Sequence, residues 1–374
     1  MPLSDIRFQD QALRLLSAAL ASDRLPHACL FCGPDGVGKE MTARALTATL
    51  LCEAGPAREL TGGCEECRQC RMLMAGTHPD WHLVERGLSQ YSEDAAVRAR
   101  QSTDLSVEVI REYLINKASS QPYCGRAKVF VVREADRMTT AAQNALLKTL
   151  EEPPPNTFVV LLAAHEERLT PTTRSRCQLI PFAPLPTDFV ASWLAANHPD
   201  LSAEARSFLA AFSGGQPGLA RLSADLELHD KKAGVVRLLA GRANGSPSEL
   251  AAAVLEAGKS MAALLGERRD DLSETELLRE SLNLLFSAVS SAFADALRLS
   301  CGYAGRPINA DQPAEVAALA GRLTSEAACG AIRRLADAQR HLEANANAQL
   351  AVESLCQWLS GVMSGPGVKD ALRG

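Results

Sequence analysis

Residues 33–40 read GPDGVGKE, which is close to the pattern of a loop that binds phosphate. Such a loop turns backbone N–H groups inward around a phosphate, at a helix N-terminus that favours negative charge. The residues that would form this cradle are Gly33, Gly36, Gly38 and Lys39. The pattern then requires Ser or Thr to hold Mg²⁺, but the next residue is Glu40. The sequence therefore predicts a phosphate loop that lacks one of its metal ligands.

The second metal ligand of a phosphate-loop protein is an acidic residue at the end of a neighbouring core strand. Here the apolar run 128–132 is followed by Arg133, and the acidic residue Glu134 comes one position later. Two metal-binding positions have therefore changed together, one to an anion and one to a cation. We predict that Glu40 and Arg133 form an ion pair in place of Mg²⁺.

Glu40 could instead bind Mg²⁺ itself, because carboxylates are good ligands for this ion. However, a carboxylate about 4 Å from a phosphate charge costs about 4 kcal/mol at an effective dielectric of 20, and Arg133 would repel the metal as well. We therefore expect no Mg²⁺ and no hydrolysis by this chain alone. Binding of ATP or ADP without hydrolysis stays open, as does a glycine-rich turn that binds nothing.

Four of the eleven cysteines are spaced as C-x11-C-x2-C-x2-C. They are Cys52, Cys64, Cys67 and Cys70. The two short gaps let the thiolates converge in a tight loop, and four thiolates would enclose Zn²⁺ in a closed structural site. The alternatives are an iron–sulfur cluster and four unrelated buried thiols. The polar surroundings favour zinc. His78 lies nearby, and we interpret it as a turn residue before Pro79.

Composition indicates a soluble chain of two or three domains. Its 374 residues are 47% hydrophobic and 22% charged. The net charge of −5 excludes a global basic field, so any contact with DNA would be local or made through partners. We expect no signal peptide, no transmembrane helix and no disulfide framework. The expected location is the cytoplasm, without a membrane partner.

The elements that must position these groups alternate between strand and helix in residues 1–184. Buried strands are predicted at 29–32, 128–132 and 158–163. Between the last two lies a predicted helix, which Thr140 and Gln143 would begin with a capping box and three prolines would stop. This order predicts a parallel sheet with crossover helices. The polar segment 86–103 is predicted to be a flexible surface loop.

The rest of the chain is predicted to be helical, so the fold class is α/β plus all-α. A helical domain is expected over 185–243, and a helical bundle, a common place to oligomerise, over 244–374. Helices of the bundle are predicted at about 249–265, 273–299, 313–343 and 347–363, from their apolar periodicity.

Read in order, the motifs are LPHACLFCGPDGVGK, the four-cysteine module, GTHPD, a strand ending in EADRM, NALLKTLEEPPPNTFVVLLA and TTRSRC. This series resembles the clamp-loader branch of AAA+ proteins, in the bacterial DNA polymerase III holoenzyme. The likeness is dense over residues 6–185 and thinner beyond. It implies an AAA+ P-loop sheet with helices on both faces and a zinc module in 1–184, a helical lid in 185–243 and a helical collar in 244–374.

Two subunit types of that family share this layout. The gamma/tau motor subunit hydrolyses ATP, whereas the delta-prime subunit usually has a degraded nucleotide site. Glu40 and Arg133 favour the delta-prime type, and so does Gly218, which stands in GQPGLA where motor subunits typically carry Arg. Ala164 likewise falls near a sensor position that is polar in motor subunits. A catalytically active gamma/tau-type ATPase is the alternative.

The resemblance implies a ring of five subunits that loads a sliding clamp onto primed DNA in replication. The partners would be gamma/tau-type ATPase subunits, a delta subunit, the clamp and, through the complex, the DNA. Arg176 of the SRC motif would act as a trans arginine finger, stabilising charge on the γ-phosphoryl group in a neighbour's nucleotide site. The chain would then be a component of a DNA-directed DNA polymerase (nucleotidyltransferase) holoenzyme, without ATPase activity of its own.

Two further readings compete with this one. A zinc-bearing DNA-binding repair protein would bind DNA alone in a salt-dependent way, but the acidic balance and the lack of a Lys/Arg-rich stripe disfavour it. An AAA+ paralogue that acts only as an oligomerisation scaffold would not co-purify with a polymerase clamp loader.

Overall fold

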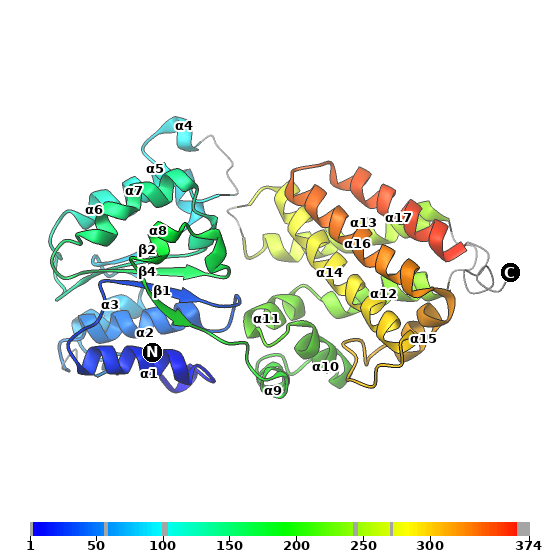
Figure 1. Cartoon of the computed structure of the whole chain (residues 1–374), viewed down its shortest axis with the longest axis horizontal. Helices are drawn as coiled ribbons and strands as arrows, with labels where there is room; N and C mark the ends of the chain where they lie inside the picture. The colour runs from blue at the N-terminus through cyan, green and yellow to red at the C-terminus, as the bar shows by residue number, and fades with distance from the viewer. Residues whose placement is uncertain (1–2, 56–58, 99–103, 242–245, 270–271, 365–374) are drawn as a thin grey trace. The chain divides into compact units, whose positions relative to one another are not determined.

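The computed structural model describes residues 3–55, 59–98, 104–241, 246–269 and 272–364. The chain divides into two compact units, residues 1–185 and residues 186–374 (Figure 1). The first boundary lies one residue from the predicted one. The boundary predicted between residues 243 and 244 lies outside the described residues and stays a prediction.

The N-terminal unit is built on a five-stranded sheet with the order β2-β3-β4-β1-β5. The strands are β1 (Ala28–Cys32), β2 (Trp81–Val84), β3 (Lys128–Val132), β4 (Thr157–Ala163) and β5 (Gln178–Pro181). All four pairings between neighbouring strands are parallel, which confirms the predicted sheet and three of its strands. β2 and β5 escaped prediction because they are edge strands of four residues with half-buried or exposed positions, and so lack a continuous apolar run.

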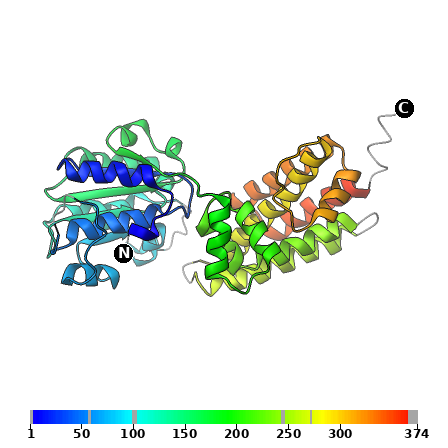
Figure 2. The ribbon, with the colours of Figure 1, turned by 90° about the horizontal axis from the view of Figure 1, so that it is seen from below.

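Helices cover both faces of the sheet, as predicted. α1 (Asp10–Ala21) and α2 (Lys39–Leu51) lie on one face, and α7 (Thr140–Glu151) lies on the other (Figures 1 and 2). On the α7 side, apolar residues of β1, β3 and β4 pack against those of the helices; this buried core includes Leu30, Phe130, Val132, Leu161, Ile110, Leu114, Leu146 and Leu150.

The remaining elements of this unit are short. The α-helices are α3 (Arg68–Met74), α4 (Ala95–Arg98), α5 (Val107–Ile110), α6 (Asn116–Ala118) and α8 (Pro171–Arg174). A π-helical turn, Arg111–Ile115, joins α5 to α6, and 3₁₀ turns span Leu3–Asp5, Arg86–Tyr91, Ala135–Arg137 and Glu166–Arg168.

The segment predicted as a flexible loop, 86–103, requires correction over residues 86–98. It contains the 3₁₀ turn at 86–91 and helix α4. Ser92 Oγ donates to a carboxylate oxygen of Glu112 at 2.6 Å, which ties the segment to the π-helical turn. Side-chain hydrogen bonds thus order a segment whose sequence has no apolar period. Residues 99–103 lie outside the described residues.

The predicted capping box at the start of α7 is also wrong. The N-cap is Thr139, whose hydroxyl accepts from Ala142 N at 3.1 Å. Gln143 is instead buried: its side chain donates to Met138 O at 3.1 Å and accepts from Thr170 N at 2.7 Å. Gln143 therefore fastens α7 to the residue that caps α8, a long-range contact that the local sequence did not reveal.

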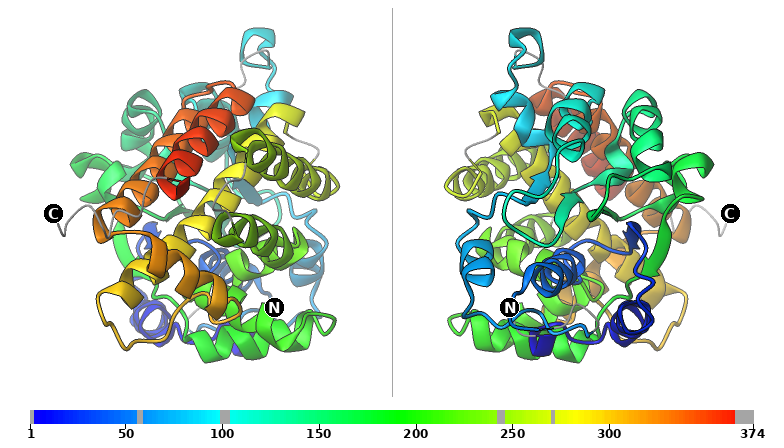
Figure 3. Two further views of the ribbon diagram at one scale, coloured as in Figure 1. Left: turned by 90° about the vertical axis from the view of Figure 1, so that its right-hand side faces the viewer. Right: turned by 90° about the vertical axis from the view of Figure 1, so that its left-hand side faces the viewer.

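The C-terminal unit is entirely helical within the described residues. Its helices are α9 (Thr187–Asn197), α10 (Ala203–Phe212), α11 (Pro217–Asp225), α12 (Leu228–Gly241), α13 (Pro247–Gly266), α14 (Glu274–Ser300), α15 (Pro313–Arg322), α16 (Ser325–Glu343) and α17 (Ala348–Ser364). α14 packs against α12, α13, α15 and α16, while α16 and α17 lie side by side (Figures 1 and 3). The single helix predicted over 313–343 is two helices, because Leu323 is extended and Thr324 caps α16 by accepting from Ala327 N.

α14 is long and apolar enough to cross a membrane by length and composition alone. However, 56% of its most apolar window is buried inside the unit, which is typical of a core helix in a helical bundle.

A buried charge cluster joins α12 to the segment before α15. Lys232 is fully buried, donates to Asp311 Oδ2 at 2.7 Å and lies 3.8 Å from the centre of the Phe208 ring. His229 Nε2 lies 3.3 Å from the same Asp311 oxygen, and His229 Nδ1 lies 2.8 Å from Asp230 Oδ1. The hydrogen bond to Asp311 is the main cause that raises the pKa of His229, against the effect of burial.

Candidate functional site

The phosphate loop runs from the end of β1 to the start of α2, as predicted. Gly33 has φ 152°, and a Cβ atom there would lie 2.2 Å from the carbonyl oxygen of Phe182, the residue after the neighbouring strand β5. Gly38 is the N-cap of α2 with φ 104°, in the left-handed region that favours glycine. Backbone geometry thus requires glycine at both ends of the cradle.

Lys39, the cation of this loop, is buried and bonded within its own chain. Its Nζ donates to Pro34 O at 2.8 Å, to Asp35 Oδ1 at 3.0 Å and to the carbonyl oxygen of Gly33. These three acceptors satisfy all three N–H groups of the ammonium. A phosphate would have to displace them before Lys39 could bind it.

Glu40 and Arg133 form the predicted ion pair. Arg133 donates from Nε and from Nη2 to the two carboxylate oxygens of Glu40, each at 2.8 Å. Its third nitrogen, Nη1, donates to Glu85 Oε2 at 2.6 Å. Burial lowers the pKa of the Arg133 guanidinium, but the charges of Glu40 and Glu85 outweigh this and raise it. One cation is therefore shared by two carboxylates, at the two positions that hold the metal in the full phosphate-loop pattern.

Glu85 and Arg86 were missed by sequence reasoning. Val84 pairs with Val132 in the parallel register of β2 and β3, so the residues after these strands lie next to one another. Arg86 Nε donates to Glu134 Oε2 at 2.7 Å, and Arg137 lies 3.7 Å from the other oxygen of Glu134. Recognising WHLV, residues 81–84, as a strand would have placed Glu85 and Arg86 next to the end of β3. Glu134, the acidic residue that follows Arg133, is thus held between two arginines.

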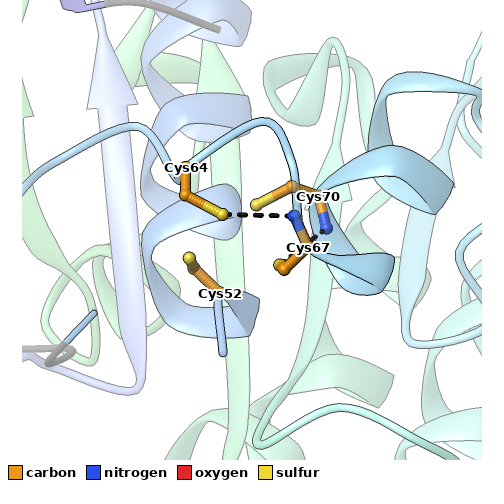
Figure 4. Close-up of side chains that lie close together, drawn as sticks. All are labelled: Cys52, Cys64, Cys67 and Cys70. Atoms are coloured by element: carbon orange, nitrogen blue, oxygen red, sulfur yellow. Dashed lines mark hydrogen bonds between the residues drawn. The ribbon is translucent and has the colours of Figure 1, made fainter. Parts of the chain in front are cut away.

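The four cysteines meet where the sequence placed them. Cys52 caps the end of α2, Cys64 precedes α3, Cys67 is the N-cap of α3 and Cys70 lies in its first turn (Figure 4). Their Sγ atoms all lie within 4.8 Å of one another. Tetrahedral Zn²⁺ with Zn–S bonds of about 2.3 Å requires sulfur separations of about 3.8 Å, so this donor set fits zinc.

Backbone N–H groups support these sulfurs. Cys67 N donates to Cys64 Sγ at 3.3 Å, and Cys70 N donates to Cys67 Sγ at 3.5 Å (Figure 4). Burial raises the pKa of the Cys67 thiol, but the hydrogen bond from Cys70 N and its other neighbours lower it to about 7. The pKa of Cys70 is raised to about 12, first by burial and then by Cys67. The cluster therefore favours loss of a proton at Cys67, as a metal ligand requires.

His78 does more than shape the turn before Pro79. It is buried; its Nδ1 accepts from Asp80 N at 3.0 Å and its Nε2 lies 2.8 Å from Gln69 Oε1. Asp80 in turn accepts from the backbone N–H groups of Tyr123, Cys124 and Gly125, at 2.6, 2.9 and 2.7 Å. This network anchors helix α3, which carries Cys70, to the segment that precedes β3.

Arg176 follows helix α8 and is bound to α7. Its Nε donates to Glu151 Oε1 at 2.6 Å, its Nη2 donates to the same oxygen, and its Nη1 donates to Thr172 O at 2.8 Å. These partners all lie on α7 and α8, so Arg176 is not brought to the phosphate loop of its own chain. Burial raises the pKa of the neighbouring Cys177 thiol to about 12.

Two family models match the chain. One, described as DNA polymerase III, delta subunit, matches residues 8–186, and the other, described as its C-terminal part, matches residues 259–360. The chain is similar to DNA polymerase III subunit delta' of Pseudomonas aeruginosa, with 36% identity over 59% of this chain and 64% of that protein. It is also similar to DNA polymerase III subunit gamma/tau of Mycobacterium bovis, with 36% identity over 50% of this chain and 29% of that protein.

Among solved structures, a DNA polymerase III gamma subunit-related protein of Thermotoga maritima matches 94% of this chain and 99% of that protein, with 15% identity and a TM-score of 0.43. The sequence matches to the Pseudomonas and Mycobacterium relatives are shorter: they span just under two thirds of the delta' relative and less than a third of the gamma/tau relative.

Proposed function

Because this chain belongs to the DNA polymerase III delta subunit family, we propose that it is a delta-prime-type clamp-loader subunit. In this role it takes part in loading a sliding clamp onto primed DNA and does not hydrolyse ATP itself. The observation that carries the proposal is the ion pair between Glu40 and Arg133, with both bonds at 2.8 Å. An internal cation bonded to two carboxylates leaves neither charge available to a metal–phosphate complex.

The occupied Lys39 supports the same conclusion. A nucleotide would have to break its three bonds to Gly33, Pro34 and Asp35 and would gain no Mg²⁺ bridge in return. We infer that the isolated chain neither requires nor turns over Mg²⁺-ATP. The four cysteines would hold structural zinc, which links α2 to α3 and has no open coordination position for catalysis.

The contribution to catalysis would come from Arg176. In the proposed ring its guanidinium enters the nucleotide site of a gamma/tau-type neighbour and stabilises the charge that develops on the γ-phosphoryl group. Such fingers contribute about 10³ to 10⁵ in rate. The other partners would be a delta subunit, the sliding clamp and, through the complex, primed DNA. All of them act in the cytoplasm.

The test compares the isolated chain with the complex. Purified chain is assayed for zinc, for bound nucleotide and for ATPase activity with Mg²⁺, and is then added to gamma/tau-type and delta subunits. We expect one zinc for about four thiolates and no ATP turnover by the isolated chain. In the complex we expect ATP turnover that the chain stimulates and that depends on the clamp. Turnover of ATP by the lone chain would instead support the alternative, an active gamma/tau-type ATPase. That alternative is worth testing because the loop retains the glycines and the lysine of the phosphate-binding pattern.

A further inference from the structure

The guanidinium of Arg176 is held by a carboxylate of its own chain. Glu151, the last residue of α7, accepts from both Nε and Nη2 of Arg176 through one oxygen, Oε1. Thr172 O accepts from Nη1 at 2.8 Å, and Ser175 Oγ lies at the weaker distance of 3.4 Å. The side chain therefore has one defined orientation although it lies at the surface.

This orientation leaves part of the guanidinium available. Arginine has five N–H donors, two of them on each terminal nitrogen. Glu151 uses the edge formed by Nε and Nη2, so one hydrogen of Nη2 is left over. Nη1 uses one hydrogen for Thr172 O and holds the other only in the 3.4 Å contact with Ser175 Oγ, which a phosphate oxygen can replace. The terminal edge is the one that can grip two oxygens of a phosphate.

The frame beneath the pair is rigid. Thr170 caps α8 by accepting from Thr173 N at 3.3 Å, and Thr170 N is itself bonded to the buried Gln143 of α7 at 2.7 Å. Glu151 is therefore the last residue of one helix, and Arg176 lies just after a second helix that is bonded to the first. Because the two backbone segments are bonded to each other, the ion pair holds the guanidinium of Arg176 in one direction.

The pair is a poor device for stability. The side chains of Arg176 and Glu151 are 31% and 47% exposed, and exposed ion pairs contribute little to the free energy of folding. Ordering a long arginine side chain also costs conformational entropy. What the pair does define is the orientation of Arg176.

We propose that Glu151 is a positioning residue, which aims the guanidinium of Arg176 at the phosphates of a nucleotide bound by a neighbouring subunit. This proposal rests on the proposed function of the chain. Pre-orientation of the finger removes the search through rotamers that would otherwise accompany the transition state. The ligand class is a nucleoside triphosphate in a partner, not in this chain.

The experiment uses the reconstituted clamp loader with full-length variants of this chain. We expect Glu151→Gln to lower kcat of the complex about tenfold and to change KM for ATP less than about twofold, since the lost order matters most in the transition state. Glu151→Asp, which keeps the carboxylate, should recover part of the rate. Glu152→Gln is the matched control, because Glu152 is exposed, adjacent and in no ion pair among the described residues.

A double variant separates positioning from a general structural role. In the Arg176→Ala background, Glu151→Gln should cause no further loss of kcat, since there is no finger left to aim. Equal, independent losses would overturn the proposal, as would a Glu151→Gln complex that is as fast as the unmodified one or faster. If Arg176→Ala itself has no effect, the proposed function fails; if only Glu151→Gln has none, the positioning role alone fails.

Discussion

Arg133 donates from two nitrogens to both carboxylate oxygens of Glu40, each at 2.8 Å, across 93 positions of the chain. The two residues replace a hydroxyl and a carboxylate that would hold Mg²⁺ in an active phosphate-loop enzyme. Without Arg133, the carboxylate of Glu40 would lack this cationic partner, and Arg133 binds Glu85 as well. The two residues thus form one electrostatic unit, as the proposed loss of the metal site requires.

Removing the cation of this unit should destabilise the N-terminal unit. Arg133→Met leaves Glu40 and Glu85 facing each other without a positive charge, so we expect a loss of about 1–2 kcal/mol in the free energy of unfolding. Urea unfolding measures it. The loss should shrink when Glu40→Gln is added, because the repulsion falls. A single variant as stable as the unmodified chain would contradict the electrostatic account.

Restoring the two metal ligands should restore affinity for a metal–nucleotide complex. The double variant Glu40→Thr with Arg133→Asp re-creates the hydroxyl and the carboxylate that hold Mg²⁺, and we expect it to bind ATP at least about tenfold more tightly with Mg²⁺ than without. Isothermal titration calorimetry of the isolated chain provides the measurement. The unmodified chain is the control, and it should show no dependence on Mg²⁺.

If Arg176 acts as the proposed finger, its loss should be visible only in the complex. Arg176→Ala is expected to leave the thermal stability of the isolated chain nearly unchanged, because its ion pair is exposed, and to lower ATPase turnover of the reconstituted complex. Arg176→Lys should not recover the rate, since an ammonium cannot grip two phosphate oxygens as a planar guanidinium does. A normal rate with either variant at saturating concentration would refute the role.

Removal of one of the four proposed zinc ligands should destabilise the module around α3. Cys67→Ser is expected to abolish stoichiometric zinc and to destabilise the N-terminal unit by several kcal/mol, because binding free energy of a structural metal contributes directly to folding. Zinc is measured by mass spectrometry, and stability by thermal melting with and without a chelator. Cys301→Ser, at an exposed cysteine of the other unit, should change neither quantity.

The C-terminal unit should lose stability as pH rises above 6.5, the ordinary pKa of histidine. Asp311 and Asp230 raise the pKa of His229 above its ordinary value of 6.5, and Lys232 is bonded to the same Asp311. A raised folded-state pKa gives stability that is fully present below pH 6.5 and is lost as pH rises through the folded-state value. Urea unfolding of the chain at pH 6 and pH 8 should therefore differ, and His229→Gln should reduce that difference. Equal pH dependence in both would show that another group is responsible.

Local chemistry was readable from the sequence alone. Three features depend only on residues within a short stretch, so their local pattern was enough to predict their structure. They are the spacing of Cys52 to Cys70, the glycines of residues 33–38 and the apolar runs of β1, β3 and β4. The ion pair of Glu40 and Arg133 could also be foreseen, because parallel strands end at the same edge of a sheet. Arg133 directly follows β3, and Glu40 begins the helix after the loop that follows β1.

Only the tertiary structure decided which residues far apart in sequence become partners, because these residues carry no pattern of their own. Glu85 contacts Arg133 because of the register of the short edge strand β2. Gln143 of α7 contacts Thr170, and Glu151 at the end of α7 contacts Arg176. A single carboxylate or amide on a helix has the same local signature whether it is solvated or paired. Its role is fixed by which neighbour the fold brings within hydrogen-bond distance, and that depends on packing of the whole unit.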